Sequence, residues 1–268
     1  MFGSDQRRFA VGATLLMTIV FVQLSDVRAD DDGDESGLRD GSTFTFVDQI
    51  EEVSEGEIQI EQQLMWSASK AEDHGYDDLE FGHEFEFGIT DQFELELGVS
   101  WGYEDGDSVD DDGIDFRTVS LEAMYHLIVP DEDTFGLAVM GEIAGGDDLL
   151  ELESEIIIQK PFGDWLFVWN GRLEAEWSED GLSESDGGLA QQIGLQYAVS
   201  PTCLLGAELI HEIEIAQWEE FEDSVLYLGP VAAYSTESFW FAVTPVFQIT
   251  DNAEEPDFMT RFVFGMEF

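Results

Sequence analysis

The sequence predicts an all-β fold, a transmembrane antiparallel up-and-down β-barrel of about twelve strands. Three observations predict it. Apolar and polar residues alternate strictly in segments of about ten from Gly56 onward, long and short connections alternate between these segments, and aromatic residues gather near the segment ends. No stretch beyond Gly56 keeps a helical spacing of apolar residues for long. We therefore expect residues 56–268 to form one transmembrane β-barrel domain.

Residues 1–29 have the pattern of an export signal. Two arginines at positions 7–8 precede an apolar run, residues 9–24, and residues 27–29 form an acceptable small-residue cleavage site. The apolar run is shorter than the ~20 residues that a spanning helix needs, which favours a cleaved signal peptide over an uncleaved membrane anchor. We expect the mature chain to begin at Asp30.

Residues 30–55 are expected to form an acidic periplasmic tail without stable structure. Most of this stretch is rich in Asp and Gly and poor in apolar groups, so it has little surface to bury. Residues 43–47 alternate briefly. That short pattern fits either an additional strand or a segment that enters the barrel lumen.

The clearest strand pair comprises residues 79–89 and 93–101, joined by the turn Thr90-Asp91-Gln92. One face of each strand carries Leu, Phe, Val or Trp, and the other carries mainly Glu, Gly or Ser, as in a sheet with one apolar and one polar side. The same alternation predicts twelve strands over residues 56–68, 78–89, 93–103, 116–127, 134–145, 149–160, 165–177, 188–199, 203–215, 224–234, 239–249 and 258–268.

The connections predict which end of the barrel faces outward. Acidic loops such as residues 104–115 and 178–187 follow the first, third, seventh, ninth and eleventh strands. Tight turns such as residues 161–164 and 200–202 follow the second, fourth, sixth, eighth and tenth. Long loops on one rim and short turns on the other are typical of outer-membrane barrels, with both termini on the periplasmic side.

Aromatic residues provide an independent test, because the alternation count did not use them. We expect an outer girdle and a periplasmic girdle at the lipid headgroup boundaries. The outer girdle comprises Trp66, Trp101, Tyr103, Phe116, Trp177, Trp218 and Tyr227, and the periplasmic girdle comprises Phe87, Phe93, Tyr125, Phe135, Trp165, Tyr197, Tyr234 and Phe239. A secreted soluble β-sandwich is the competing fold, and it has no reason to place aromatic residues in two bands.

Five polar residues stand against this assignment, because they fall on the lipid-facing parity. They are Gln62, His83, Ser154, Gln191 and His211. We interpret some of them as marks of β-bulges or of errors in the strand register.

The inward parity carries a large excess of carboxylates. Many buried carboxylates would each need a partner, whereas carboxylates lining a water-filled lumen stay solvated. This indicates a wet interior that attracts cations, although general acidity suited to a salty habitat would give the same composition. Arg172 and Arg261 are the basic residues expected there. The acidic residues expected to line the lumen are Glu80, Glu84, Glu86, Glu94, Glu96, Glu151, Glu153, Glu155, Glu174, Glu176, Glu208 and Glu212.

Composition excludes several other functions. The chain has 61 acidic and 9 basic residues and a net charge of −52, so it repels nucleic acid, and its single cysteine, Cys203, excludes a disulfide scaffold. His83 and His211 each precede a Glu that lies on the opposite face of a strand, which disfavours a hydrolase triad. The acidic run of residues 151–155 lacks an evident metal-binding loop. We expect no enzyme activity, no cofactor and no dedicated metal site.

One part of the sequence resembles a known family. Residues 56–61, residues 79–97 and the turn Gly88-Ile89-Thr90-Asp91 are similar to the opening hairpins of outer-membrane transporter-like proteins grouped with the meta-pathway of phenol degradation. The terminal Phe268 also resembles the C-terminal signature that the outer-membrane assembly machinery recognises. The resemblance implies a barrel that passes small molecules. It supplies no catalytic residues, and the aromatic substrates of that family are not carried over.

These observations together predict a passive channel for small solutes in the outer membrane of a Gram-negative-type bacterium. Its expected partners are the lipid bilayer, the assembly machinery, and small solutes or cations. A non-conducting structural or adhesive barrel, a barrel enzyme and the soluble sandwich remain as alternatives. Measurement of conductance separates the first two of these from a channel.

Overall fold

A computed structural model describes residues 41–51, 54–105, 113–131, 133–178 and 182–268. The expected signal peptide and residues 30–40 of the expected tail lie outside this part of the chain. The described residues form thirteen strands. They are β1 (Ile58–Lys70), β2 (Asp77–Thr90), β3 (Phe93–Asp105), β4 (Asp115–Ile128), β5 (Gly136–Gly146), β6 (Leu149–Phe162), β7 (Trp165–Ser178), β8 (Glu184–Ser200), β9 (Cys203–Ala216), β10 (Glu220–Phe221), β11 (Val225–Ser235), β12 (Phe239–Gln248) and β13 (Pro256–Glu267).

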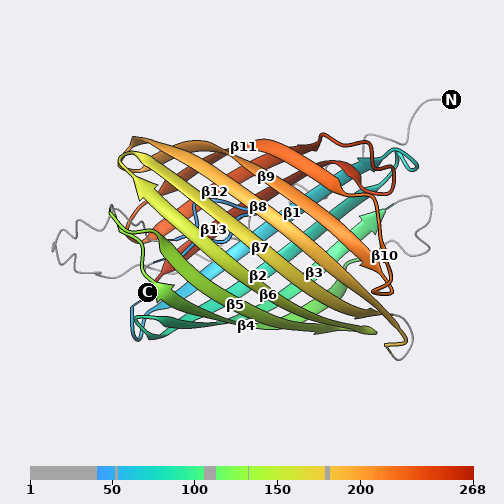
Figure 1. Cartoon of the computed structure of the whole chain (residues 1–268), viewed down its shortest axis with the longest axis horizontal. Helices are drawn as coiled ribbons and strands as arrows, with labels where there is room; N and C mark the ends of the chain where they lie inside the picture. Colours follow the sequence, from blue (N-terminus) through green and yellow to red (C-terminus); the bar gives the residue numbers. More distant parts are fainter. Residues whose placement is uncertain (1–40, 52–53, 106–112, 132, 179–181) are drawn as a thin grey trace. The chain divides into compact units, whose positions relative to one another are not determined.

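Twelve of these strands close into an antiparallel barrel (Figure 1). Each long strand pairs with the next long strand along the chain, and β13 returns to pair with β1. The short β10 pairs only with the end of β9, so it extends one hairpin and is not a wall strand. Among the described residues, closure leaves no wall strand with an unpaired edge, and an even number of wall strands allows all pairs to be antiparallel. The predicted fold class is confirmed, and the strand boundaries agree with the prediction to within a few residues.

The two ends of the barrel differ in their connections. We call the end with the two-residue turns at 91–92, 163–164 and 201–202 the short-turn end, and the opposite end the loop end. Strand β1 begins and strand β13 ends at the short-turn end.

One predicted tight turn is wrong, because seven residues, 129–135, connect β4 to β5. Pro130 has no N–H to donate to a strand ladder, which helps to end β4. Asp131 then accepts hydrogen bonds from the backbone N–H groups of Asp133 and Thr134, at 2.8 Å and 2.6 Å. These N–H groups hold the pKa of the exposed Asp131 carboxyl below its usual value. The Asp131 side chain thus binds the backbone of its own loop.

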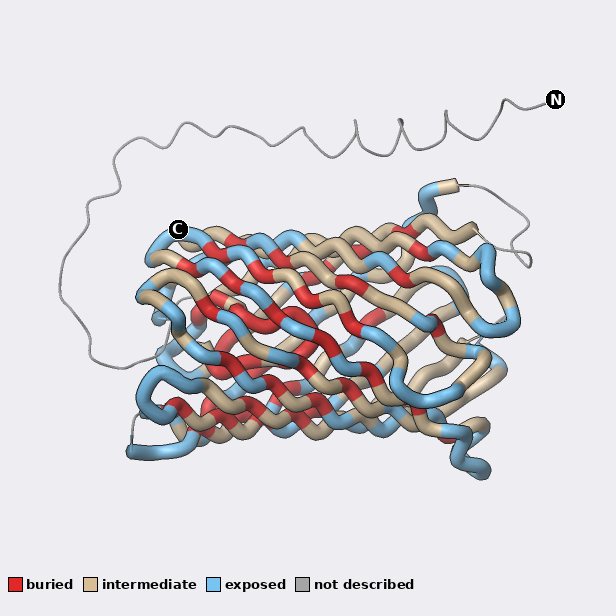
Figure 2. Tube along the Cα trace, turned by 90° about the horizontal axis from the view of Figure 1, so that it is seen from above, coloured by how far each residue is buried: buried red, intermediate tan, exposed pale blue. Residues whose placement is uncertain are grey.

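The outward face of the barrel is apolar. Buried and exposed residues alternate along the strands (Figure 2), and large outward side chains such as Leu97, Leu121 and Ile143 are 44–47% exposed. So large an apolar surface is unfavourable in water and favourable in lipid. Among the described residues, no helix is both long enough and apolar enough to cross a membrane.

The five polar residues on the lipid-facing parity are not register errors. The pairing is continuous at all of them, so that interpretation is wrong. Gln62 lies directly opposite His83, and Gln191 lies directly opposite His211. Side chains in direct cross-strand pairs are close neighbours, so each of these amides has a polar group within reach.

Many of the predicted girdle aromatics are exposed on the outward face. Trp66 is exposed near the loop end, and Trp165 packs against Tyr197 near the short-turn end with ring centroids 5.0 Å apart. The predicted place of Tyr227 in the outer girdle is wrong, because its side chain faces inward and is 1% exposed. Both faces of β11 are apolar, so the amino-acid pattern there does not distinguish inside from outside.

The interior of the barrel has a dry part and a wet part. Apolar side chains projecting inward from β9, β11, β12 and β13 form one buried cluster, which contains Leu204, Ala233, Trp240, Ala242 and Val263. Residues 41–51, here called the inner segment, lie inside the barrel, and Phe44, Val47 and Ile50 pack into a second buried cluster with residues of β4–β7 and β11. The expectation of an unstructured tail is therefore wrong for residues 41–51. Of the two interpretations of residues 43–47, the structure agrees with the segment that enters the barrel lumen and not with an additional strand. The apolar side chains of residues 41–51 are buried against apolar residues inside the barrel, whereas residues 30–40 have few apolar side chains to bury.

Candidate solute passage

A cavity of about 500 Å³ lies between the inner segment and the wall formed by β1–β7 and β13. Its lining extends from Gln59 and Glu94, near the short-turn end, to Arg117 and Leu149, near the loop end. Among the described residues, twelve carboxylates and three guanidinium groups line it. The carboxylates belong to Asp48, Glu51, Glu61, Glu80, Glu84, Glu86, Glu94, Glu96, Glu122, Glu142, Glu151 and Glu153, and the guanidinium groups to Arg117, Arg172 and Arg261.

Six glutamates form a continuous row across six neighbouring strands, which we call the glutamate ladder. Each lies directly opposite the next in the strand register, from β2 to β7. The row rises along the barrel, because its first member is four residues from the short-turn end of β2 and its last is four residues from the loop end of β7. The ladder comprises Glu86, Glu96, Glu122, Glu142, Glu153 and Glu174.

This ladder is unfavourable for folding. Like charges directly opposite each other on neighbouring strands destabilise a sheet. In a water-filled cavity, water and mobile cations would reduce that repulsion. Rows of acidic side chains in general attract cations and repel anions.

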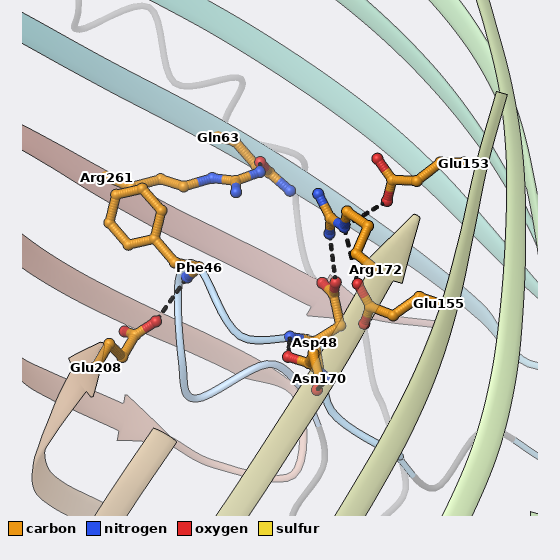
Figure 3. Close-up of polar contacts among 9 residues, drawn as sticks. All are labelled: Phe46, Asp48, Gln63, Glu153, Glu155, Asn170, Arg172, Glu208 and Arg261. Carbon is orange, nitrogen blue, oxygen red and sulfur yellow. Dashed lines mark hydrogen bonds and ion pairs between the residues drawn. The ribbon is translucent and has the colours of Figure 1, made fainter. Parts of the chain in front are cut away.

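Two of the three basic residues of the cavity do little to offset the charge of the ladder. The Arg172 guanidinium forms ion pairs with Asp48 at 3.0 Å, Glu153 at 2.7 Å and Glu155 at 2.8 Å (Figure 3). Arg117 forms an ion pair with Asp78. Arg172 and Arg117 are therefore neutralised by carboxylates beside them.

Arg261 is placed differently. Its guanidinium donates a hydrogen bond to the side-chain oxygen of Gln63 and lies 5.9 Å from the ring centroid of Phe46 (Figure 3). Its charge therefore faces the cavity beside the inner segment.

The structure distributes the predicted lumen residues among several environments. Glu176 lies opposite Glu151 near the loop end, and Glu212 lies opposite Ala190 and Val225, away from the cavity lining. Glu174 has a carboxylate oxygen within 4.8 Å of oxygens of Glu151 and Glu153. Such a cluster is common without a bound ion, so it assigns no metal site. Of the predicted lumen residues, those in the lining of this cavity are Glu80, Glu84, Glu86, Glu94, Glu96, Glu151, Glu153, Arg172 and Arg261.

Two predicted lumen glutamates that lie outside the cavity lining are buried by partners and not solvated. Glu155 is 2% exposed beside Arg172, and Glu208 is 0% exposed beneath the inner segment. Glu208 accepts hydrogen bonds from the backbone N–H groups of Thr45 and Phe46, at 3.0 Å and 2.7 Å. The expectation of a water-exposed position is wrong for these two, because parity gives the face of a strand and not what covers that face.

Several interior residues were not anticipated from the sequence. His126 and Glu94 form a buried contact of 2.9 Å between Nε2 and a carboxylate oxygen. Asn170, Gln159 and Gln196 bind the inner segment. Their inward parity was visible in the sequence, but an amide on a lumen wall is equally compatible with contact to water.

Phe268 ends the chain at the short-turn end of the barrel. Its backbone N–H donates to the carbonyl oxygen of Ile58 at 3.0 Å, and its side chain is exposed. The terminal residue is thus tied to the first strand through its backbone, and its ring remains accessible.

Comparison with solved structures identifies the fold. The NanC porin is 9% identical, with a TM-score of 0.54, and the match covers 79% of this chain and 98% of that one. The KdgM porin is 11% identical, with a TM-score of 0.51, covering 78% and 98%. The translocator domain of the autotransporter NalP from Neisseria meningitidis is 11% identical, with a TM-score of 0.52, covering 81% and 89%. The chain is thus similar in fold to outer-membrane β-barrels.

Comparison of sequences places the chain in a family. No curated protein sequence matches it. The porin-like part of the sequence resemblance agrees with the structural neighbours, whereas the grouping with the meta-pathway of phenol degradation is not tested by them. A family match extends over residues 36–259, which include the inner segment and nearly all of the barrel. The chain belongs to DUF6662, a family of unknown function.

Proposed function

We propose that the protein is an outer-membrane channel through which small solutes diffuse along the acidic cavity, with cations favoured over anions. The glutamate ladder carries this proposal, because it places carboxylates at successive heights along one wall. Rows of acidic side chains select cations by attracting them and by repelling anions. The apolar outward face and the fold likeness to the NanC and KdgM porins support the location and the channel class.

Three expectations about the chain remain part of this proposal. Residues 1–29 act as a cleaved export signal, and the exposed ring of Phe268 is read by the outer-membrane assembly machinery of a Gram-negative-type cell. The resemblance to transporter-like proteins grouped with the meta-pathway of phenol degradation is used only to propose a barrel that passes small molecules. The solute of one KdgM structure, oligogalacturonate, is not assigned to this chain.

The test is the reversal potential of the mature chain, residues 30–268, across a KCl gradient in a planar bilayer. Correct folding is checked first by a change in gel mobility between unheated and heated samples. We expect a potential of the sign set by potassium. A folded barrel without conductance would contradict the channel and favour a structural or adhesive role, and a potential of the opposite sign would contradict the cation preference.

Charge variants connect the selectivity to the ladder. Glu122→Gln combined with Glu142→Gln removes two neighbouring carboxylates from the cavity wall. We expect the potassium-to-chloride permeability ratio to fall roughly two-fold or more, since the local field weakens. Glu219→Gln combined with Glu237→Gln makes the same change in net charge at exposed positions outside the cavity lining. An equal fall in this control would show that net charge, and not the ladder, sets the preference.

A further inference from the structure

The inner segment is bound to the barrel wall by side chains that replace a neighbouring strand. The Asn170 side chain accepts a hydrogen bond from the backbone N–H of Asp48 and donates one to the carbonyl oxygen of the same residue, both at 3.0 Å (Figure 3). Gln159 makes the same two hydrogen bonds with Ile50, also at 3.0 Å. Each amide thereby satisfies both backbone groups of one residue, as a paired strand would.

Two further wall residues hold the first half of the segment. Gln196 donates to the carbonyl oxygen of Thr43 at 2.5 Å and accepts from its hydroxyl group at 2.8 Å. Glu208 accepts from two backbone N–H groups of the segment and from the hydroxyl group of Thr244 at 2.5 Å. Four strands, β6 to β9, therefore each contribute at least one inward side chain to the same eleven-residue segment.

The wall also has the shape that the segment requires. A Cβ atom at Gly194 would lie 2.6 Å from the Phe44 ring, and a Cβ atom at Gly136 would lie 2.8 Å from Cδ1 of Ile50. Both distances are shorter than van der Waals contact, so larger residues at these positions would compete with the segment for space. The glycines and the four polar side chains indicate a built-in element of the fold and not a tail that has entered the lumen.

The segment forms one side of the cavity. Ser42, Asp48, Gln49 and Glu51 line it, while Phe44, Val47 and Ile50 face the apolar cluster. Asp48 is further fixed by the ion pair with Arg172. The segment fills the part of the barrel cross-section that lies beside the cavity. It therefore narrows the cavity.

We propose that the inner segment, residues 41–51, is a fixed internal constriction that sets the width of the passage and hence the largest solute that can cross. This inference rests on the proposed channel function and deepens it. The segment acts by permanent occupancy: it stays docked while solutes pass along the glutamate ladder on its other side.

Deletion of residues 41–51 tests the constriction. Single-channel conductance and the size limit for neutral polyethylene glycols are measured for the wild-type and deletion proteins in planar bilayers. We expect the deletion to raise the conductance roughly two-fold or more and to admit larger polymers, since the freed part of the lumen fills with water. A folded deletion variant with wild-type conductance and size limit would overturn the inference.

A milder pair of variants decides the question if the deletion protein does not fold. Gly194→Val introduces atoms where the Phe44 ring lies, and we expect it to move conductance and size limit toward the deletion values. Adding Phe44→Ala removes the ring and should restore the wild-type size limit. Gly141→Val is the matched control, because Gly141 is exposed on the outward face and its Cβ would lie 3.7 Å from the nearest atom, an ordinary contact. Indistinguishable behaviour of Gly194→Val and Gly141→Val would contradict the inference.

The same measurements separate this inference from the proposed function. If folded wild-type and deletion proteins are both silent, the channel function fails and the constriction fails with it. If the wild-type protein conducts and the deletion changes nothing, only the constriction fails. If the wild-type protein is silent and the deletion protein conducts, the segment narrows the lumen as inferred but closes it, and the open passage of the proposed function is contradicted.

Discussion

Individual carboxylates of equal chemistry have different roles inside this barrel, and their nearest partners decide which. Glu208 is fully buried and bound by N–H and O–H donors, so it acts as a structural acceptor. Glu122 and Glu142 face each other across a strand pair and line the cavity. Glu155 is buried against Arg172. Burial with partners favours a structural role, whereas contact with the cavity leaves the charge available to solutes.

Arg172 is the residue whose loss should destabilise the barrel most clearly. Arg172→Met would leave Asp48, Glu153 and Glu155 without their shared counter-charge, and we expect the free energy of unfolding to fall by about 3 kcal/mol. The midpoint of urea unfolding in detergent measures this. Arg261→Met is the comparison: Arg261 donates a hydrogen bond to the neutral Gln63 and acts on Glu61, Glu84 and Glu208 only at longer range, so we expect a smaller loss. Equal losses for the two variants would argue against the importance of the carboxylate cluster.

At the level of strands, β11 and β12 differ from the rest of the wall. Their inward residues include Val231, Ala233, Ala242 and Val246, and their outward residues are also mostly apolar. A strand that is apolar on both faces is buried on both faces, here by lipid outside and by apolar clusters inside. Most of the acidic strands β2 to β7 instead have one polar face, which borders the cavity.

This difference predicts opposite tolerance to one substitution. Ala242→Gln places an amide in the dry cluster, and we expect a loss of roughly 2 kcal/mol from an unsatisfied polar group and overpacking. Ala144→Gln places the same amide beside the cavity, where it can contact water. Urea unfolding of both variants measures the contrast. A loss for Ala144→Gln as large as that for Ala242→Gln would contradict the division into dry and wet parts.

For the whole molecule, the net charge of −52 is distributed unevenly. The outward wall is mainly apolar, the cavity has twelve carboxylates, and loop-end connections carry others such as Asp73, Asp148 and Glu222. The barrel therefore presents lipid with little charge, and in the proposed function solutes cross along a strongly negative path. Charge of this kind depends on pH, because only ionised carboxylates contribute to it.

The proposed cation preference should consequently weaken as the solution is acidified. Protonation removes negative charge from the cavity, so the potassium-to-chloride permeability ratio should fall when the pH is lowered from 7 toward 4 and recover when it is raised again. The reversal potential, recorded with the same membrane at each pH, measures this. A ratio that does not change over this range would contradict a selectivity set by cavity carboxylates.

The alternation of apolar and polar residues was sufficient to predict the barrel, the number of wall strands and the face on which most glutamates lie. Residues 79–89 and 93–101 illustrate why: a strand of period two with one apolar face contains the needed information within about ten residues. The inward position of Tyr227 could not be predicted in this way, because its strand lacks the contrast between faces.

The closed antiparallel wall could be predicted from short stretches of sequence, because strand period and turn positions are local properties. The glutamate ladder and the contacts of the inner segment became visible only in the folded chain. The ladder depends on the register between five pairs of strands. The segment depends on contacts such as Ile50 with Gln159 and Thr45 with Glu208, which are 109 and 163 residues apart in the chain. Such contacts form only when barrel closure brings distant strands around one interior, and no local pattern records them.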